Sequence, residues 1–138
     1  MAGVHFTFDN FKQLLNLTVG IAQRLDENRS ESFTLLYCDF STISQETVDN
    51  SLESVLRNSD SIVHYGSDYF FVLPYTDKYG ASIVKKMFIE FFVRNLDSFA
   101  VSYPVDGEDS QALVEKLRYS VKSSYGSDLK CLEIPFKQ

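Results

Sequence analysis

Between Phe33 and Pro104 the sequence alternates strand-like and helical patterns in an order that few folds can accommodate. A strand-like run and a helical pattern are followed by two strand-like runs around a tight turn, then by a second helical pattern and another strand. Strands joined by a two-residue turn pair antiparallel, and short connections return both helices to the same sheet. This is the order of the ferredoxin-like split βαβ arrangement. We therefore predict an α+β fold with a βαββαβ core, in which helices flank a mainly antiparallel central sheet.

The limits of the individual elements follow from their local patterns. The run FTLLYCDF (33–40) is rich in β-forming residues without alternation, which predicts a central strand buried on both faces. Gly66-Ser67 between SIVHY and YFFVLP favours a type II′ hairpin over 61–74. The other predicted elements are helices over 9–26 with Asp9 as N-cap, over 45–57 with Ser44 as N-cap, over 80–96, and over 110–125 with Asp109 or Ser110 as N-cap and Gly126 at its end. Strands are predicted over 98–104 and 130–135.

The helix predicted over 80–96 has a wide apolar face and two interpretations. One face carries six apolar residues, while Ile89 and Val93 lie among charged residues. Such a helix is either buried deeply by its own domain, which is common and which we favour, or it is an edge that faces a partner. The six residues are Ile83, Val84, Met87, Phe88, Phe91 and Phe92.

Composition narrows the classes of function. With 138 residues, 44% of them hydrophobic, we expect residues 1–138 to form one domain. A net charge of −6 with scattered basic residues argues against nucleic-acid binding. The longest apolar run, 87–93, is interrupted by Glu90, so we expect no membrane insertion and a cytoplasmic location. Cys38 and Cys131 lack CxxC spacing, which favours buried thiols over a disulfide or a metal site.

Several segments, in their order along the chain, resemble the GGDEF domain family. These are bacterial diguanylate cyclases, which join two GTP molecules into cyclic di-GMP. The resemblance covers roughly residues 8–135 and rests on ordered segments, because any one of them alone would be weak evidence. The segments are LLYCDFS (35–41), RNSDSIVHYGSDYFFVLP (57–74) and YPVDGEDSQALVEKL (103–117), followed by Lys122.

The signature that names this family is degenerate here. It reads Gly66-Ser67-Asp68-Tyr69-Phe70, so that Tyr69 replaces the glutamate. Asp39 stands where the resemblance places the first metal-binding aspartate, and Ser41 replaces the second. The span between Asp39 and the signature is also shorter than the family's by roughly a dozen residues, and this stretch supplies the guanine-reading side chains. The resemblance therefore implies an inactive relative with no catalytic residues, no cofactor and no metal, in which Asp39 and Asp68 are vestigial.

The sequence also resembles the family in the residue spacing of a second site. Arg57 and Asp60 form the Arg-x-x-Asp pair of the allosteric site that binds cyclic di-GMP, and Lys85 or Lys86 is a candidate second cation. Arginine forks onto the O6/N7 edge of guanine, and aspartate accepts from its N1 and N2 hydrogens. The structural alternative is that Arg57 stabilises a helix C-terminus and that Asp60 is an ordinary turn residue contributing little to folding.

Three functions remain after these observations. The first is a non-enzymatic receptor for cyclic di-GMP. The second is an interaction or dimerisation module without a nucleotide, which binds another signalling protein or a second copy through an apolar surface around Ile89 and Val93. The third, an enzyme of altered specificity, is disfavoured because His5 and His64 have no triad or ligand partner at a recognisable spacing.

Overall fold

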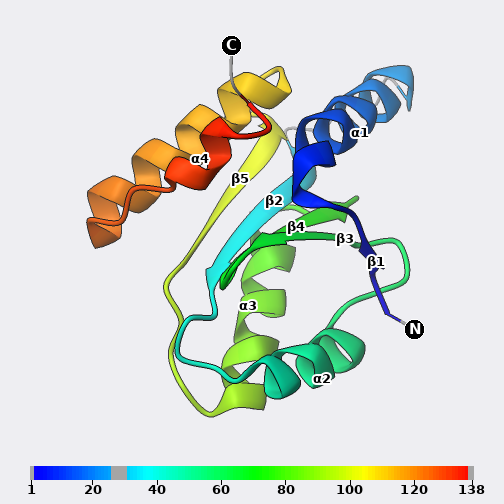
Figure 1. Ribbon diagram of the computed structural model, residues 1–138. Helices are drawn as coiled ribbons and strands as arrows, with labels where there is room; N and C mark the ends of the chain where they lie inside the picture. The colour runs from blue at the N-terminus through cyan, green and yellow to red at the C-terminus, as the bar shows by residue number, and fades with distance from the viewer. Residues whose placement is uncertain (1, 26–30, 137–138) are drawn as a thin grey trace.

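A computed structural model describes residues 2–25 and 31–136, and Figure 1 shows a twisted sheet between two layers of helices. In chain order the elements are β1 (Val4–His5), the 3-10 turn η1 (Phe8–Asn10), α1 (Phe11–Leu25), β2 (Glu31–Asp39), α2 (Gln45–Val55), β3 (Ser61–Tyr65), β4 (Asp68–Pro74), α3 (Lys78–Phe92), β5 (Ser98–Pro104), α4 (Ser110–Tyr125) and the 3-10 turn η2 (Lys130–Glu133). None of the described helices is long and apolar enough to cross a membrane.

The sheet has the topology that the order of elements predicts. Its strands lie in the order β1-β3-β4-β2-β5. The pairs β3/β4, β4/β2 and β2/β5 are antiparallel, and only the short β1 pairs parallel, with β3. The antiparallel β4 therefore separates β2 from β3, which are joined through α2, and this is the split βαβ arrangement. The predicted α+β fold class and ferredoxin-like core are confirmed.

Two helical layers cover opposite faces of the sheet (Figure 1). Leu35 and Tyr37 of β2 belong to one buried cluster, which includes side chains of α1 and α4. Leu36 and Cys38 belong to the other cluster, which includes side chains of α2 and α3. Successive side chains of a strand point to opposite faces, so a strand covered on both sides needs apolar residues throughout. This confirms the prediction that the run 33–40 forms a central strand.

The predicted turn and three of the predicted helix ends are confirmed. Tyr65 pairs with Asp68, which leaves Gly66 and Ser67 as the two-residue loop. Gly66 has a φ of 58, and the φ of Ser67 is not positive. A type II′ turn requires this combination. The predicted residues Ser44, Asp109 and Gly126 cap α2 at its start and α4 at its start and end, respectively.

The ends of three helices differ from the sequence prediction. The helix α2 ends at Val55 instead of residue 57. Asp9 is not an N-cap, because the 3-10 turn η1 already begins at Phe8 and Thr7 precedes it. The predicted end of this helix at residue 26 lies outside the described residues. The helix α3 spans Lys78–Phe92 instead of 80–96, since Val93 adopts a left-handed conformation with φ 54. This conformation ends the helix before Asn95 and Leu96.

The strand predicted over 130–135 is wrong. This segment contains η2 instead, and Leu129, Leu132 and Phe136 are buried in the cluster that α1 and α4 share. Their spacing of three and four residues is helical, whereas Ile134 is exposed. In the described part of the chain, β5 is consequently the last strand of the sheet.

The favoured prediction that α3 is buried deeply by its own domain is also wrong in part. Only Ala81 and Phe88 of this helix are fully buried, and Ile89 is half-buried against the core. Ile83, Met87 and Phe91 are each about 40% exposed, at successive positions four residues apart. They form an exposed apolar row on α3, and we call these three residues the α3 row.

Candidate functional site

The ends of β2 and β4 bring the two signature carboxylates together. The antiparallel pairing of these strands places Asp39 directly opposite Asp68. Asp68 is the first residue of β4, after the hairpin loop, and Asp39 is the last residue of β2. The register therefore gives the proximity expected for the two carboxylates of a GGDEF-like site.

Both carboxylates already have partners within the domain. The buried Tyr37 hydroxyl donates a hydrogen bond of 2.8 Å to Asp68 Oδ1. The Ser41 amide donates one of 2.9 Å to Asp39 Oδ1. Burial raises the pKa of Asp68; the bond from Tyr37 lowers it, and the negative charge of Asp39 raises it further. Asp68 at the tip of the hairpin is therefore a partly desolvated carboxylate that is hydrogen-bonded within the domain. It does not form an open pair of anions with Asp39.

Tyr69, which the sequence resemblance places at the glutamate of the signature, is a buried aromatic residue. Its side chain is only 2% exposed. The ring stacks on His64 with 4.6 Å between centroids and lies 4.9 Å from the ring of Phe40. Its hydroxyl accepts a hydrogen bond of 3.2 Å from Gln45 Nε2. The signature position is thus part of the core beneath α2 and α3.

Among the described residues there is no cluster of possible metal ligands, and neither thiol is activated. Within residues 2–25 and 31–136, no three His, Cys, Asp or Glu side chains lie close enough together to hold a metal ion. Cys38 and Cys131 are free thiols. Burial raises the pKa of Cys131 to about 11, and burial also raises the pKa of Cys38. Both thiols are therefore mostly protonated and weakly nucleophilic at neutral pH.

Arg57 and Asp60 form a closed turn between α2 and β3. Asp60 is 1% exposed, and its Oδ2 accepts the Arg57 amide at 2.8 Å. Its Oδ1 accepts Arg57 Nη2 at 3.1 Å. The carboxylate is therefore a structural group that holds its own arginine, whereas the sequence offered either a guanine-reading group or an ordinary turn residue.

The arginine of this turn reaches across to the end of β4. Arg57 Nη2 also donates to the Pro74 carbonyl and to Thr76 Oγ1, each at 3.0 Å. The side chain nevertheless remains 56% exposed. The guanidinium is held in one orientation with part of its surface open to solvent.

The two lysines proposed as a second cation lie on α3. Lys85 is half-buried, and its positive charge opposes the raised pKa of the Cys38 thiol. Lys86 is exposed. The hydrogen bonds and ion pairs described for Arg57 involve neither lysine, so their part in a ligand site stays a prediction.

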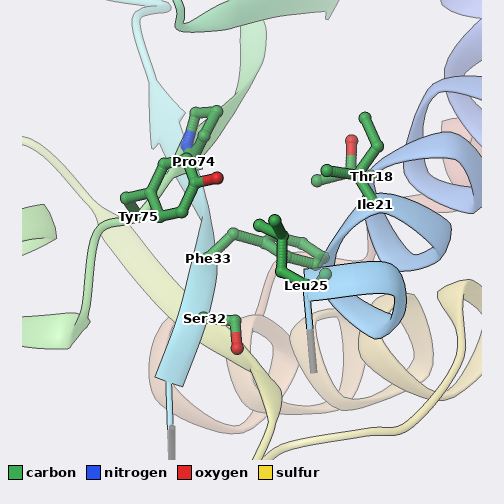
Figure 2. Close-up of a pocket in the computed structure, with 8 residues that line it drawn as sticks. Thr18, Ile21, Leu25, Ser32, Phe33, Pro74 and Tyr75 are labelled. Atoms are coloured by element: carbon green, nitrogen blue, oxygen red, sulfur yellow. The ribbon is translucent and has the colours of Figure 1, made fainter. Parts of the chain in front are cut away.

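A shallow apolar groove adjoins the same end of β4. Figure 2 shows Ile21 and Leu25 of α1 on one side, Pro74 and Tyr75 on the other, and Phe33 between them. The groove encloses about 350 Å³ of space, including space open to solvent. Tyr75 has φ 54, a conformation that is uncommon outside glycine. Pro74 belongs both to this groove and to the set of groups that bind Arg57.

Sequence analysis missed Tyr37 as a partner of Asp68. Tyr37 lies opposite Phe70, two residues from the pair of Asp39 and Asp68 on the same face of the sheet. Such diagonal neighbours are within reach of a long side chain. The register of β2 against β4 would have identified this contact.

Comparison with known proteins finds solved structures that are similar to this chain. No protein-family model matches the sequence, and no curated protein matches it. Among solved structures, the chain is similar to a sensory box/GGDEF family protein from Caulobacter crescentus CB15, with 16% identity and a TM-score of 0.62 over 86% of this chain and 94% of that one. It is also similar to the S helix-GGDEF-EAL portion of LapD from Vibrio cholerae, bound to c-di-GMP, with 14% identity and a TM-score of 0.55.

The LapD comparison covers 88% of this chain and 33% of that one, so this chain spans one third of the LapD structure. Sequence identities this low show a shared fold and leave the activity open. By its fold, the chain is similar to GGDEF-family proteins.

Proposed function

We propose that this chain is a catalytically inactive GGDEF-like signalling domain. The observation that carries the proposal is the buried Tyr69 in place of the signature glutamate. Nucleotidyl transfer with two metal ions needs carboxylates that hold the cations against the triphosphate. Here Asp68 is bound by Tyr37, and the neighbouring signature position carries an aromatic ring packed on His64.

We expect the purified chain to form no cyclic di-GMP from GTP with Mg²⁺ or Mn²⁺. Removal of the acidic side chain and of the base-reading segment takes away both charge stabilisation and substrate positioning. Chromatography of the reaction mixture, with an enzyme-free sample beside it, measures the product. Formation of cyclic di-GMP above this background, abolished by Asp68→Ala, would overturn the proposal.

The ligand that we propose for the domain is cyclic di-GMP, bound at the turn of Arg57. Support comes from the half-exposed guanidinium, which Asp60, Pro74 and Thr76 hold in one orientation. A preorganised arginine loses little entropy when it stacks on a base or forks onto the guanine O6/N7 edge. The structure of LapD, a protein of similar fold, was solved with c-di-GMP bound. In this proposal Asp60 positions Arg57 instead of reading guanine itself.

Arg57→Ala is expected to weaken cyclic di-GMP binding roughly thirtyfold, or by about 2 kcal/mol, because a charge-assisted contact to the base is lost. Arg57→Lys keeps the charge but loses the planar fork, so it should lose most of the affinity as well. Isothermal titration calorimetry measures both variants against the wild type.

Lys116→Ala serves as the matched control, since Lys116 is an exposed cation on α4, across the sheet from α2. This variant should bind like the wild type. If the wild type gives neither heat nor shifts of the amide resonances of residues 57–65 at high ligand concentration, the receptor proposal fails. An Arg57→Ala variant that binds normally would also exclude this site.

The α3 row favours a second candidate, an interaction module without a nucleotide. Ile83, Met87 and Phe91 expose apolar surface along one helix, and Val93 beyond them is 89% exposed. Contiguous apolar surface of this kind marks protein interaction sites. The sequence placed the interaction surface around Ile89 and Val93 instead, and of these Ile89 is half-buried against the core and contributes less. If calorimetry detects no binding of cyclic di-GMP, this second candidate function remains.

A further inference from the structure

The strand β5 is an uncharged edge strand. Among the described residues it pairs only with β2, and no further strand follows it in the sheet order. Its sequence SFAVSYP contains no charged side chain and is rich in β-forming residues. Exposed strand edges of this composition pair with other chains unless something blocks them. In Figure 1 the strand lies at the margin of the sheet beside α4.

The outward-facing backbone groups of β5 are bonded to side chains at both ends of the strand. At Ser98, the Tyr125 hydroxyl donates to the carbonyl at 2.9 Å and accepts the amide at 3.3 Å. At Ser102, Asp106 Oδ2 accepts the amide at 2.8 Å, while the Asp106 amide donates to the carbonyl at 2.9 Å. Backbone groups two residues apart point the same way, so Ala100 faces outward between these two capped residues.

These two caps are fixed by different elements of the fold. Tyr125 is the last residue of α4, which packs against β5. Asp106 lies in the turn after β5, and its carboxylate also forms an ion pair of 2.7 Å with Lys78 Nζ of α3. The Asp106 side chain is only 13% exposed. Each cap is therefore held in place independently of the other.

We propose that the β5 edge is a pairing surface for a second copy of this chain, which Tyr125 and Asp106 keep closed. Antiparallel pairing of two β5 strands about Ala100 places Ser98 of each copy opposite Ser102 of the other. On the opposite face, the same register places Phe99 opposite Val101. This self-complementary, uncharged register fits a symmetric dimer, whose two copies contribute the same surface. The proposal does not depend on a nucleotide site.

The variant Tyr125→Phe/Asp106→Ala should free both outward groups of Ser98 and the outward amide of Ser102, and so allow pairing. Sedimentation equilibrium is expected to give it a mass twice that of the wild type at equal concentration. Tyr125→Phe alone retains the ring and loses only the hydroxyl, so it should shift the mass in the same direction to a smaller extent. Tyr119→Phe is the matched control, because Tyr119 lies on the same helix and is 72% exposed, and this variant should keep the wild-type mass.

A third substitution tests whether the association uses this edge. Ala100→Pro, added to the double variant, removes the central one of the three outward amides, that of Ala100 between Ser98 and Ser102, and should return the mass to the wild-type value. Circular dichroism verifies that each variant is folded. A folded double variant with the wild-type mass would overturn the proposal, and so would a dimer that persists with Ala100→Pro. If the double variant does not fold, an unchanged mass of folded Tyr125→Phe at its highest soluble concentration overturns the proposal instead.

Discussion

Tyr69→Glu, which restores the acidic residue of the signature, is expected to lower the free energy of unfolding by about 4 to 5 kcal/mol. Tyr69 is almost completely buried and packs its ring against His64, Phe40 and Phe71. The substitution removes these contacts and buries a carboxylate without a described cation beside it. Urea denaturation at neutral pH measures the loss.

Tyr69→Phe is the matched control for this prediction. It keeps the ring and removes only the hydroxyl that Gln45 bonds, so the expected loss is about 1 kcal/mol or less. The deficit of Tyr69→Glu relative to the wild type should shrink as the pH falls, because the neutral acid costs less to bury than the anion. A glutamate variant as stable as the wild type would show that the pocket of Tyr69 accepts a charge.

Asp60→Ala is expected to cost about 3 kcal/mol of folding stability, because two hydrogen bonds to a buried carboxylate are lost. The substitution leaves the Arg57 amide without its acceptor and frees the guanidinium from Oδ1. This expectation reverses the one from sequence, in which a turn carboxylate contributes little. Asp60→Asn should lose about half as much, since the amide oxygen replaces one of the two acceptors.

Thermal or urea unfolding distinguishes Asp60→Ala from a surface substitution of the same type. Asp49→Ala removes an exposed aspartate of α2 that bonds only Gln45 among the described contacts, and it should change stability by about 0.5 kcal/mol or less. Equal effects of the two substitutions would mean that the turn tolerates the loss of its buried carboxylate.

The order of the core elements could be predicted from sequence because each has a strong local period. The run 33–40, the Gly66-Ser67 loop and the caps at Ser44 and Asp109 are all visible within a few residues. The segment 130–135 failed because a short apolar stretch fits either a strand or a helical turn. Burial of Leu129 and Leu132 in the cluster that α1 and α4 share decides between them, and burial is a tertiary property.

The candidate site was less predictable because its contacts join distant parts of the chain. The bond between Tyr37 and Asp68 requires the register of two strands, and that from Arg57 to Pro74 requires the position of the turn beside β4. The two-residue strand β1 was also missed, since its partner β3 begins far along the chain. Gly3, just before this strand, has a φ of 77, a conformation that favours glycine.

The two-sided burial of β2 has a consequence for how the domain unfolds. The helices α1 and α4 pack on one cluster and α2 and α3 on the other, and β2 supplies alternate side chains to both. The strand cannot leave one cluster without leaving the other, so neither helical layer retains its half of the core when the central strand detaches. The neighbouring β4 likewise supplies Phe70 to one cluster and Phe71 to the other, so unfolding of the two layers is coupled through shared strands. This makes the loss of structure cooperative across the sheet.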